Sequence, residues 1–120
     1  MILVDTSVWV DHLRRGEPAL VALLERGDVL VHPFVVGELA CGNLSNRTEL
    51  LELLQQLPAS TVAEHAEVMG FIEARRLYGR GIGYVDAHLL ASAAMDQAPL
   101  WTRDQRLRDA ANGLSLAASD

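Results

Sequence analysis

Four acidic residues stand where the side chains of an α/β protein could do chemistry. Asp5 directly follows a short apolar run, and Asp104 stands shortly after another. Glu38 lies inside an apolar helical segment, and Asp86 lies near the start of an alanine-rich one. Carboxylates that are brought close together repel one another and partly protonate unless a cation neutralises them. Oxygen ligands without a histidine or cysteine set favour hard ions, so these acids predict a site for Mg²⁺, with Mn²⁺ as a substitute.

Short apolar segments alternate with helical patterns along the chain. Strands are predicted at residues 2–4, 29–31 and 100–102, with a last edge strand at 114–116. Helices are predicted at residues 6–13, 18–25, 34–42, 64–78 and 104–111, around Leu50, Leu54 and Leu57, and around the stripe of Ala87, Ala91 and Ala94. This alternation predicts a mainly parallel sheet with helices on both faces, a three-layer α/β/α sandwich that forms a single domain over residues 1–120.

The predicted sheet would bring the four acids to one rim. In open α/β sheets, ligands bind at the carboxyl ends of the strands, where the order of the strands reverses. Each acid alone has a structural explanation. Asp5 and Asp104 could cap the helices that follow them, Glu38 could be a solvated helix residue, and Asp86 could favour a helix N-terminus electrostatically. Four acids at the same rim together favour the metal site.

Composition restricts the class of protein. The chain has 120 residues, half of them hydrophobic, and its net charge of −6 argues against a basic coat protein of nucleic acid but not against a nuclease. No apolar run is long enough to span a membrane, and no basic segment precedes the first apolar run as it would in a signal peptide. The single cysteine, Cys41, is expected to be a small buried residue in a reducing compartment, so the protein is expected in the cytoplasm.

The basic residues exclude further classes of protein. All ten of them are arginine, and lysine is absent. A phosphorylated receiver domain and an aspartate-nucleophile phosphatase both carry acids after the first strand, but each of these families also uses a lysine. The sequence therefore disfavours both.

Four segments carry a resemblance to a known family. The segments are LVDTSVWVDHL (3–13), VVGELACG (35–42), GIGYVDAHLLASAA (81–94) and LWTRDQRLRDAA (100–111). In their order and spacing they resemble the PIN domain in its bacterial VapC toxin form, and the resemblance extends over essentially the whole chain. The chain is short for this family, which predicts trimmed loops in the region that selects the RNA.

The resemblance implies a Mg²⁺-dependent endoribonuclease that cleaves structured RNA, usually transfer or ribosomal RNA. It also implies a homodimer that a small antitoxin of the VapB type holds inactive in a toxin–antitoxin hetero-oligomer, with the antitoxin tail in the active-site groove. The residues that match the family's four acids are Asp5 and Asp86 as metal ligands, and Glu38 and Asp104 as ligands or as residues that orient them. Thr6 or Ser7, and Thr102, match the hydroxyl positions that support the site.

The sequence leaves two further questions open, the role of several arginines and whether the module is catalytic. Arg75, Arg76 and Arg80 precede the Asp86 segment and Arg103 precedes Asp104, so these arginines are candidates to hold RNA phosphates near the metal; the alternative is a solvated helix face. A catalytically silent PIN-like module that binds RNA or a protein partner would carry the same fold. Such a module would tolerate the substitution of asparagine for Asp86.

Overall fold

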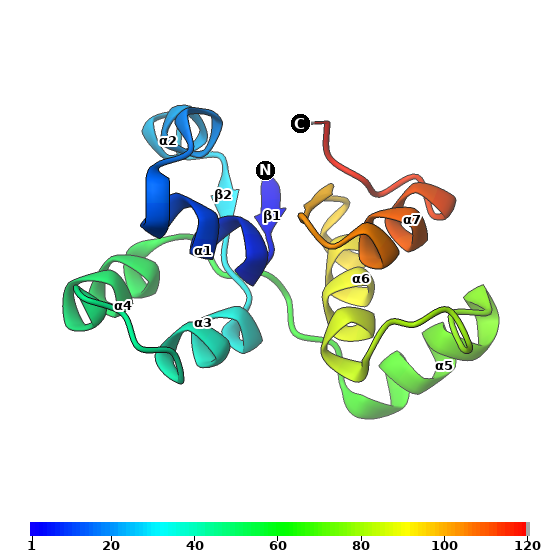
Figure 1. Ribbon diagram of the computed structural model, residues 1–120. Coiled ribbons are helices and arrows are strands. Elements are labelled where there is room, and N and C mark those ends of the chain that lie inside the picture. The colour runs from blue at the N-terminus through cyan, green and yellow to red at the C-terminus, as the bar shows by residue number, and fades with distance from the viewer. Residues whose placement is uncertain (120) are drawn as a thin grey trace.

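A small parallel sheet lies at the centre of the computed structural model, which describes residues 1–119 (Figure 1). Its strands are β1 (Ile2–Val4), β2 (Val29–Leu30) and β3 (Leu100–Trp101), in the order β2-β1-β3. Leu3 of β1 pairs with Leu30 on one side and with Leu100 on the other. After β1 the chain forms β2 on one side of it and, much later, β3 on the other side, so the strand order reverses at the carboxyl end of β1.

Single-residue bridges extend the sheet at both edges. Val31 pairs in parallel with Ala59, and Leu100 pairs in parallel with Ala117. The prediction of an edge strand at 114–116 is therefore wrong. Residues 114 and 115 form a turn, and the N–H groups of Leu114 and Leu116 donate to the carbonyl of Ala111. The chain reaches the sheet only after this turn, where the Leu116 carbonyl and the Ala118 N–H bond to Leu100 and Ala117 forms the bridge. The bridge at Ala59 was not predicted, because one residue after a proline leaves no alternating pattern.

Helices form the other two layers. In the view of Figure 1, the first four helices gather on one side of the strands and the last three on the other. This arrangement confirms the predicted three-layer α/β/α sandwich. The predicted helices all occur, with ends displaced by a few residues: α1 (Thr6–Arg15), α2 (Pro18–Glu25), α3 (Pro33–Ala40), α4 (Arg47–Gln56), α5 (His65–Arg75), α6 (Tyr84–Asp96) and α7 (Gln105–Gly113).

The core forms around β1 and α6. Leu3 and Val4 of β1 are fully buried, and every residue of α6 from position 87 to 93 is buried as well. Small side chains in this stretch let the helix lie close to β3, which it contacts. The expectation that Cys41 is buried is wrong, because this residue follows the last turn of α3 and is exposed. No helix within residues 1–119 is long and apolar enough to cross a membrane.

One histidine is buried completely in this core. The backbone N–H of Phe34 donates to Nδ1 of His32 over 3.0 Å, so Nε2 carries the proton and donates to the Ser92 hydroxyl at 3.1 Å. The pKa of His32 is lowered from 6.5 to about 4, mainly by burial and also by the nearby His88, while Asp96 opposes the shift. The imidazole is therefore neutral at pH 7, with both ring nitrogens bonded.

This buried imidazole predicts a loss of stability in acid. Because the pKa of folded His32 lies below its unfolded value, its contribution is complete above about pH 6.5 and is lost as the pH falls toward 4. The loss amounts to about 3 kcal/mol at 1.36 kcal/mol per pKa unit. Urea unfolding at several pH values should show that His32→Gln has a shallower pH dependence than the wild type across this window. Equal slopes in His32→Gln and the wild type would contradict the assignment.

Candidate active site at the carboxyl end of the sheet

Asp5 lies at the centre of the site, directly after β1, and only 7% of it is exposed. It occupies the N-cap position of α1, yet its carboxylate makes no capping hydrogen bond to that helix. Its Oδ2 instead accepts hydrogen bonds from the hydroxyls of Ser7 and Thr102, each at 2.8 Å. Two donors on one oxygen fix the orientation of the carboxylate, so helix capping does not explain this residue.

The same hydroxyls connect the end of β1 to the turn after β3. The backbone N–H of Arg103 donates to Ser7 Oγ at 3.0 Å, and the N–H of Asp104 donates to Thr102 Oγ1 at 3.1 Å. Asp104 is the N-cap of α7, where its Oδ1 accepts from the N–H of Leu107. For Asp104 the capping explanation is therefore correct for one carboxylate oxygen, and its backbone N–H joins the residue to Thr102, which bonds to Asp5.

The other two acids come from α3 and α6. Glu38 is exposed and accepts a hydrogen bond of 2.7 Å from the Thr6 hydroxyl, which links α3 to α1. Asp86 lies in the first turn of α6 and accepts from the N–H of Gly83 at 3.1 Å. The sequence left open whether Thr6 or Ser7 supports the site; in the structure, Thr6 contacts Glu38 and Ser7 contacts Asp5.

The electrostatics of Asp86 show that the other three acids act on its carboxyl group. Burial is the main cause that raises the pKa of Asp86 above its ordinary value, and the hydrogen bond from Gly83 opposes this shift. The negative charges of Asp5, Asp104 and Glu38 then raise the pKa of Asp86 further. A positive charge placed among these acids would relieve that repulsion.

The set of donors suits a hydrated hard cation. Within residues 1–119, no three side chains among histidine, cysteine, aspartate and glutamate lie close enough together to enclose a metal ion by themselves. Mg²⁺ does not require such a cage, because it keeps several of its waters and binds through one or two carboxylates. The metal-binding and catalytic roles of the four acids stay predictions, and the oxygen donors fit them.

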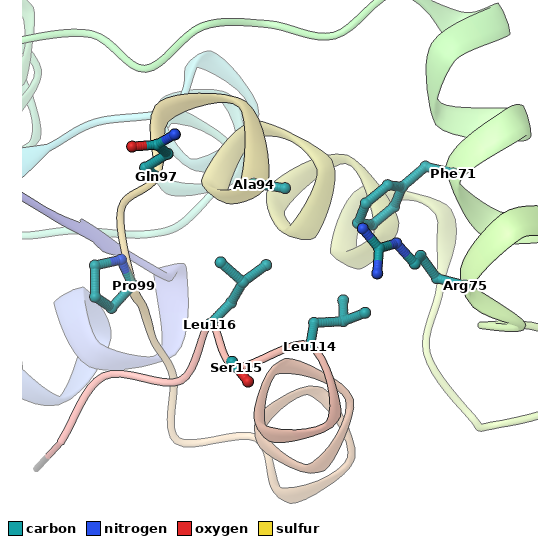
Figure 2. Close-up of a pocket in the computed structure, with 8 residues that line it drawn as sticks. All are labelled: Phe71, Arg75, Ala94, Gln97, Pro99, Leu114, Ser115 and Leu116. Atoms are coloured by element: carbon teal, nitrogen blue, oxygen red, sulfur yellow. The ribbon is translucent and has the colours of Figure 1, made fainter.

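The arginines that were candidates for RNA binding do not gather around these acids. Arg75 lies over the Phe71 ring, 5.9 Å from its centroid, at a pocket of about 290 Å³ into which Leu114 and Leu116 project (Figure 2). Gln97, at the C-terminal end of α6, lines this pocket, whereas Asp86 lies in the first turn of the same helix. At a rise of 1.5 Å per residue, the two positions are about 16 Å apart along the helix axis. Arg75 therefore belongs to the opposite end of the sheet.

The remaining candidates occupy three different surroundings. Arg76 is exposed after the last turn of α5, and Arg80 lies near Gly113 at the end of α7. Arg103 forms ion pairs with Asp11 and Glu17. No signal in the sequence could have revealed these two partners, because they lie more than 80 residues from Arg103 along the chain.

Comparisons with known proteins identify the family. The model of the PIN domain matches residues 2–113 of this chain. Two relatives named Ribonuclease VapC32, from two strains of Mycobacterium tuberculosis, are each 48% identical over 120 residues, which covers 98% of this chain and 97% of the relative. The chain therefore belongs to the PIN domain family. Within that family, the resemblance to the VapC form is confirmed.

Solved structures share the fold. A toxin–antitoxin complex from Klebsiella pneumoniae matches with a TM-score of 0.72 at 17% identity, covering 99% of this chain and 97% of the other. FitAcB from Neisseria gonorrhoeae matches with a TM-score of 0.65 at 25% identity, covering 100% and 97%. A FitAB structure bound to a DNA fragment matches with a TM-score of 0.63 at 24% identity, covering 93% and 91%. These likenesses confirm the PIN-like architecture.

The repulsion of Asp86 by the other three acids predicts that removing one of their charges will shift the pKa of Asp86. Replacing Asp104 with asparagine removes one of the negative charges that raise the pKa of Asp86, so the pKa of Asp86 should fall toward its ordinary value. NMR titration of the side-chain carboxyl carbons would measure it. Asp28→Asn, before β2 at the other end of the sheet, should leave the pKa of Asp86 unchanged. A pKa that is identical in Asp104→Asn and the wild type would show that these acids do not interact.

Proposed function

We propose that this chain is an endoribonuclease of the VapC type that hydrolyses phosphodiester bonds in structured RNA with the help of a divalent cation, Mg²⁺ or Mn²⁺. The observation that carries the proposal is the electrostatic coupling of Asp86 to Asp5, Glu38 and Asp104 at the carboxyl end of the sheet. The 48% identity to a ribonuclease over nearly the whole chain supports the same conclusion.

In this proposal each group around the cation has a separate role. Asp5 and Asp86 hold the cation, and Glu38 and Asp104 either complete the ligand set or orient it. When bound, Mg²⁺ supplies an activated water and relief of negative charge on the phosphate oxygens. The hydroxyls of Ser7 and Thr102 keep the Asp5 carboxylate in one orientation. One carboxylate of the set accepts the proton that the attacking water releases.

The proposal extends to the biological role of the chain. Two of the structural neighbours are described as a toxin–antitoxin complex and as FitAB bound to DNA. We propose that this chain is likewise a toxin, that it acts in the cytoplasm on transfer or ribosomal RNA, and that a VapB-type antitoxin neutralises it. A homodimer within a toxin–antitoxin hetero-oligomer is the proposed assembly.

Expression in a bacterial host tests the catalytic role of the acids. Wild-type protein should arrest growth and produce new RNA ends, and Asp86→Asn should do neither, because loss of a metal ligand should lower the cleavage rate at least about 100-fold. Asp28→Asn serves as the matched control and should behave like the wild type. Arrest by both wild type and Asp86→Asn with intact RNA would contradict catalysis and favour a silent module that sequesters RNA or a partner.

Removal of divalent cations tests the cofactor. Purified protein treated with EDTA should lose RNA cleavage, and Mg²⁺ or Mn²⁺ should restore it, since the donors are oxygen atoms. Zn²⁺ should not restore cleavage, because it prefers nitrogen and sulfur ligands. Cleavage that continues at the same rate in EDTA would overturn the metal-dependent mechanism.

A further inference from the structure

The side chain of Arg103 lies between two carboxylates instead of reaching toward solvent. Its Nε is 3.4 Å from Oδ2 of Asp11, and its Nη2 donates to Oε2 of Glu17. The guanidinium carbon lies 5.4 Å from the centre of the Trp101 ring, a distance that allows a cation–π contact. All three charged side chains are less than one-third exposed, so solvent screens these pairs less than it would screen pairs on the surface.

Both acids are held by their own helices. Asp11 lies on α1 and pairs with Arg15 one turn later at 3.3 Å. Glu17 is the N-cap of α2, and its other oxygen, Oε1, accepts from the N–H of Ala19 at 3.3 Å. The two carboxylates are therefore in place for Arg103, whose planar guanidinium can meet both at once, as a lysine ammonium could not.

The main chain of Arg103, by contrast, lies inside the acidic site. Its N–H donates to Ser7 Oγ, and Ser7 donates to Asp5. Its neighbours are Thr102, whose hydroxyl also donates to Asp5, and Asp104. A single residue thus joins the acidic site, through its backbone, to the start of α2, through its side chain.

We propose that Arg103 is a positioning residue: its ion pairs with Asp11 and Glu17 hold the turn 102–104 so that the Thr102 hydroxyl stays on Asp5 and the Asp104 carboxylate stays within the acidic site. This proposal rests on the proposed function. It replaces the expectation that Arg103 holds an RNA phosphate. The guanidinium of Arg103 already pairs with two carboxylates, so its charge is compensated and attracts a phosphate less than an unpaired arginine would.

Substitution of Glu17 separates the two roles. Glu17→Gln removes the charge but keeps the shape and the oxygen that caps α2. If Arg103 positions the turn, Glu17→Gln and Arg103→Gln should each lower kcat about 10- to 100-fold and leave KM within about twofold. The double variant should be no worse than either single variant, because the two side chains act as one unit. Arg103→Lys, which keeps the charge, should recover part of the loss.

The matched control is the exposed ion pair of Arg26 with Asp28, 3.3 Å apart at the other end of the sheet. Arg26→Gln and Asp28→Asn alter the same kinds of charge and should leave kcat and KM at their wild-type values. A different pattern would show that Arg103 binds RNA and would overturn the proposal. In that case Arg103→Gln would bind RNA more weakly, with an unchanged kcat and with the salt dependence of its binding constant reduced by about 1. Glu17→Gln would then bind RNA as tightly as the wild type or more tightly.

A measurement without RNA keeps the inference separate from the proposed function. Hydrogen exchange of the Arg103 and Asp104 amides, followed by NMR, should be faster in Glu17→Gln and Arg103→Gln than in the wild type, because their bonds to Ser7 and Thr102 loosen. Wild-type exchange rates in both variants would overturn the positioning role whatever the activity. If the wild type cleaves no RNA but these amides exchange faster in the variants, the proposed function fails and the structural inference stands.

Discussion

Repulsion of the Asp86 carboxylate by those of Asp5, Glu38 and Asp104 is the constraint on which the arrangement of this site depends. Three of the four acids stand at helix N-termini: Asp5 before α1, Asp86 in the first turn of α6 and Asp104 before α7. The partial positive charge at a helix N-terminus offsets part of the repulsion. Burial is the main cause of the raised pKa of Asp86, and the charges of the other three acids add to it; a bound cation would relieve that repulsion.

The sheet makes this crowding possible. β1 is the central strand, and the order of the strands reverses at its carboxyl end, so helices that leave from both sides begin at the same rim. Hydroxyl groups then fix the orientation of the Asp5 carboxylate, since Ser7 and Thr102 donate to the same oxygen of this residue. The Arg103 ion pairs extend this support to α1 and α2, away from the acids themselves. The buried network of His32 and Ser92 serves the interior and contains none of the four acids.

Asp86 in the acidic site and His32 in the core change the stability of the fold in opposite directions as the pH falls. The raised pKa of Asp86 means that the folded state binds protons more readily than the unfolded state there, so this residue favours folding as the pH falls through its folded pKa. The lowered pKa of His32 means the reverse between about pH 6.5 and 4. A single pH titration of stability therefore mixes two opposite contributions, and only substitutions at each residue separate them.

The sequence by itself determined the order of the elements, the α/β/α class, the family and the four candidate acids, because hydrophobic periodicity and motif spacing are local properties of the chain. It could not determine which hydroxyl serves which acid: Thr6 and Ser7 are adjacent, yet they bond to Glu38 and to Asp5. It also mistook residues 114–116 for a strand, since the apolar Leu114 and Leu116 on either side of Ser115 resemble the alternating pattern of a short edge strand. Only the tertiary structure placed Arg75 at the far end of the sheet and Arg103 between Asp11 and Glu17. The physical reason is that the partner of a long charged side chain depends on the packing of distant helices, and no local pattern records that packing.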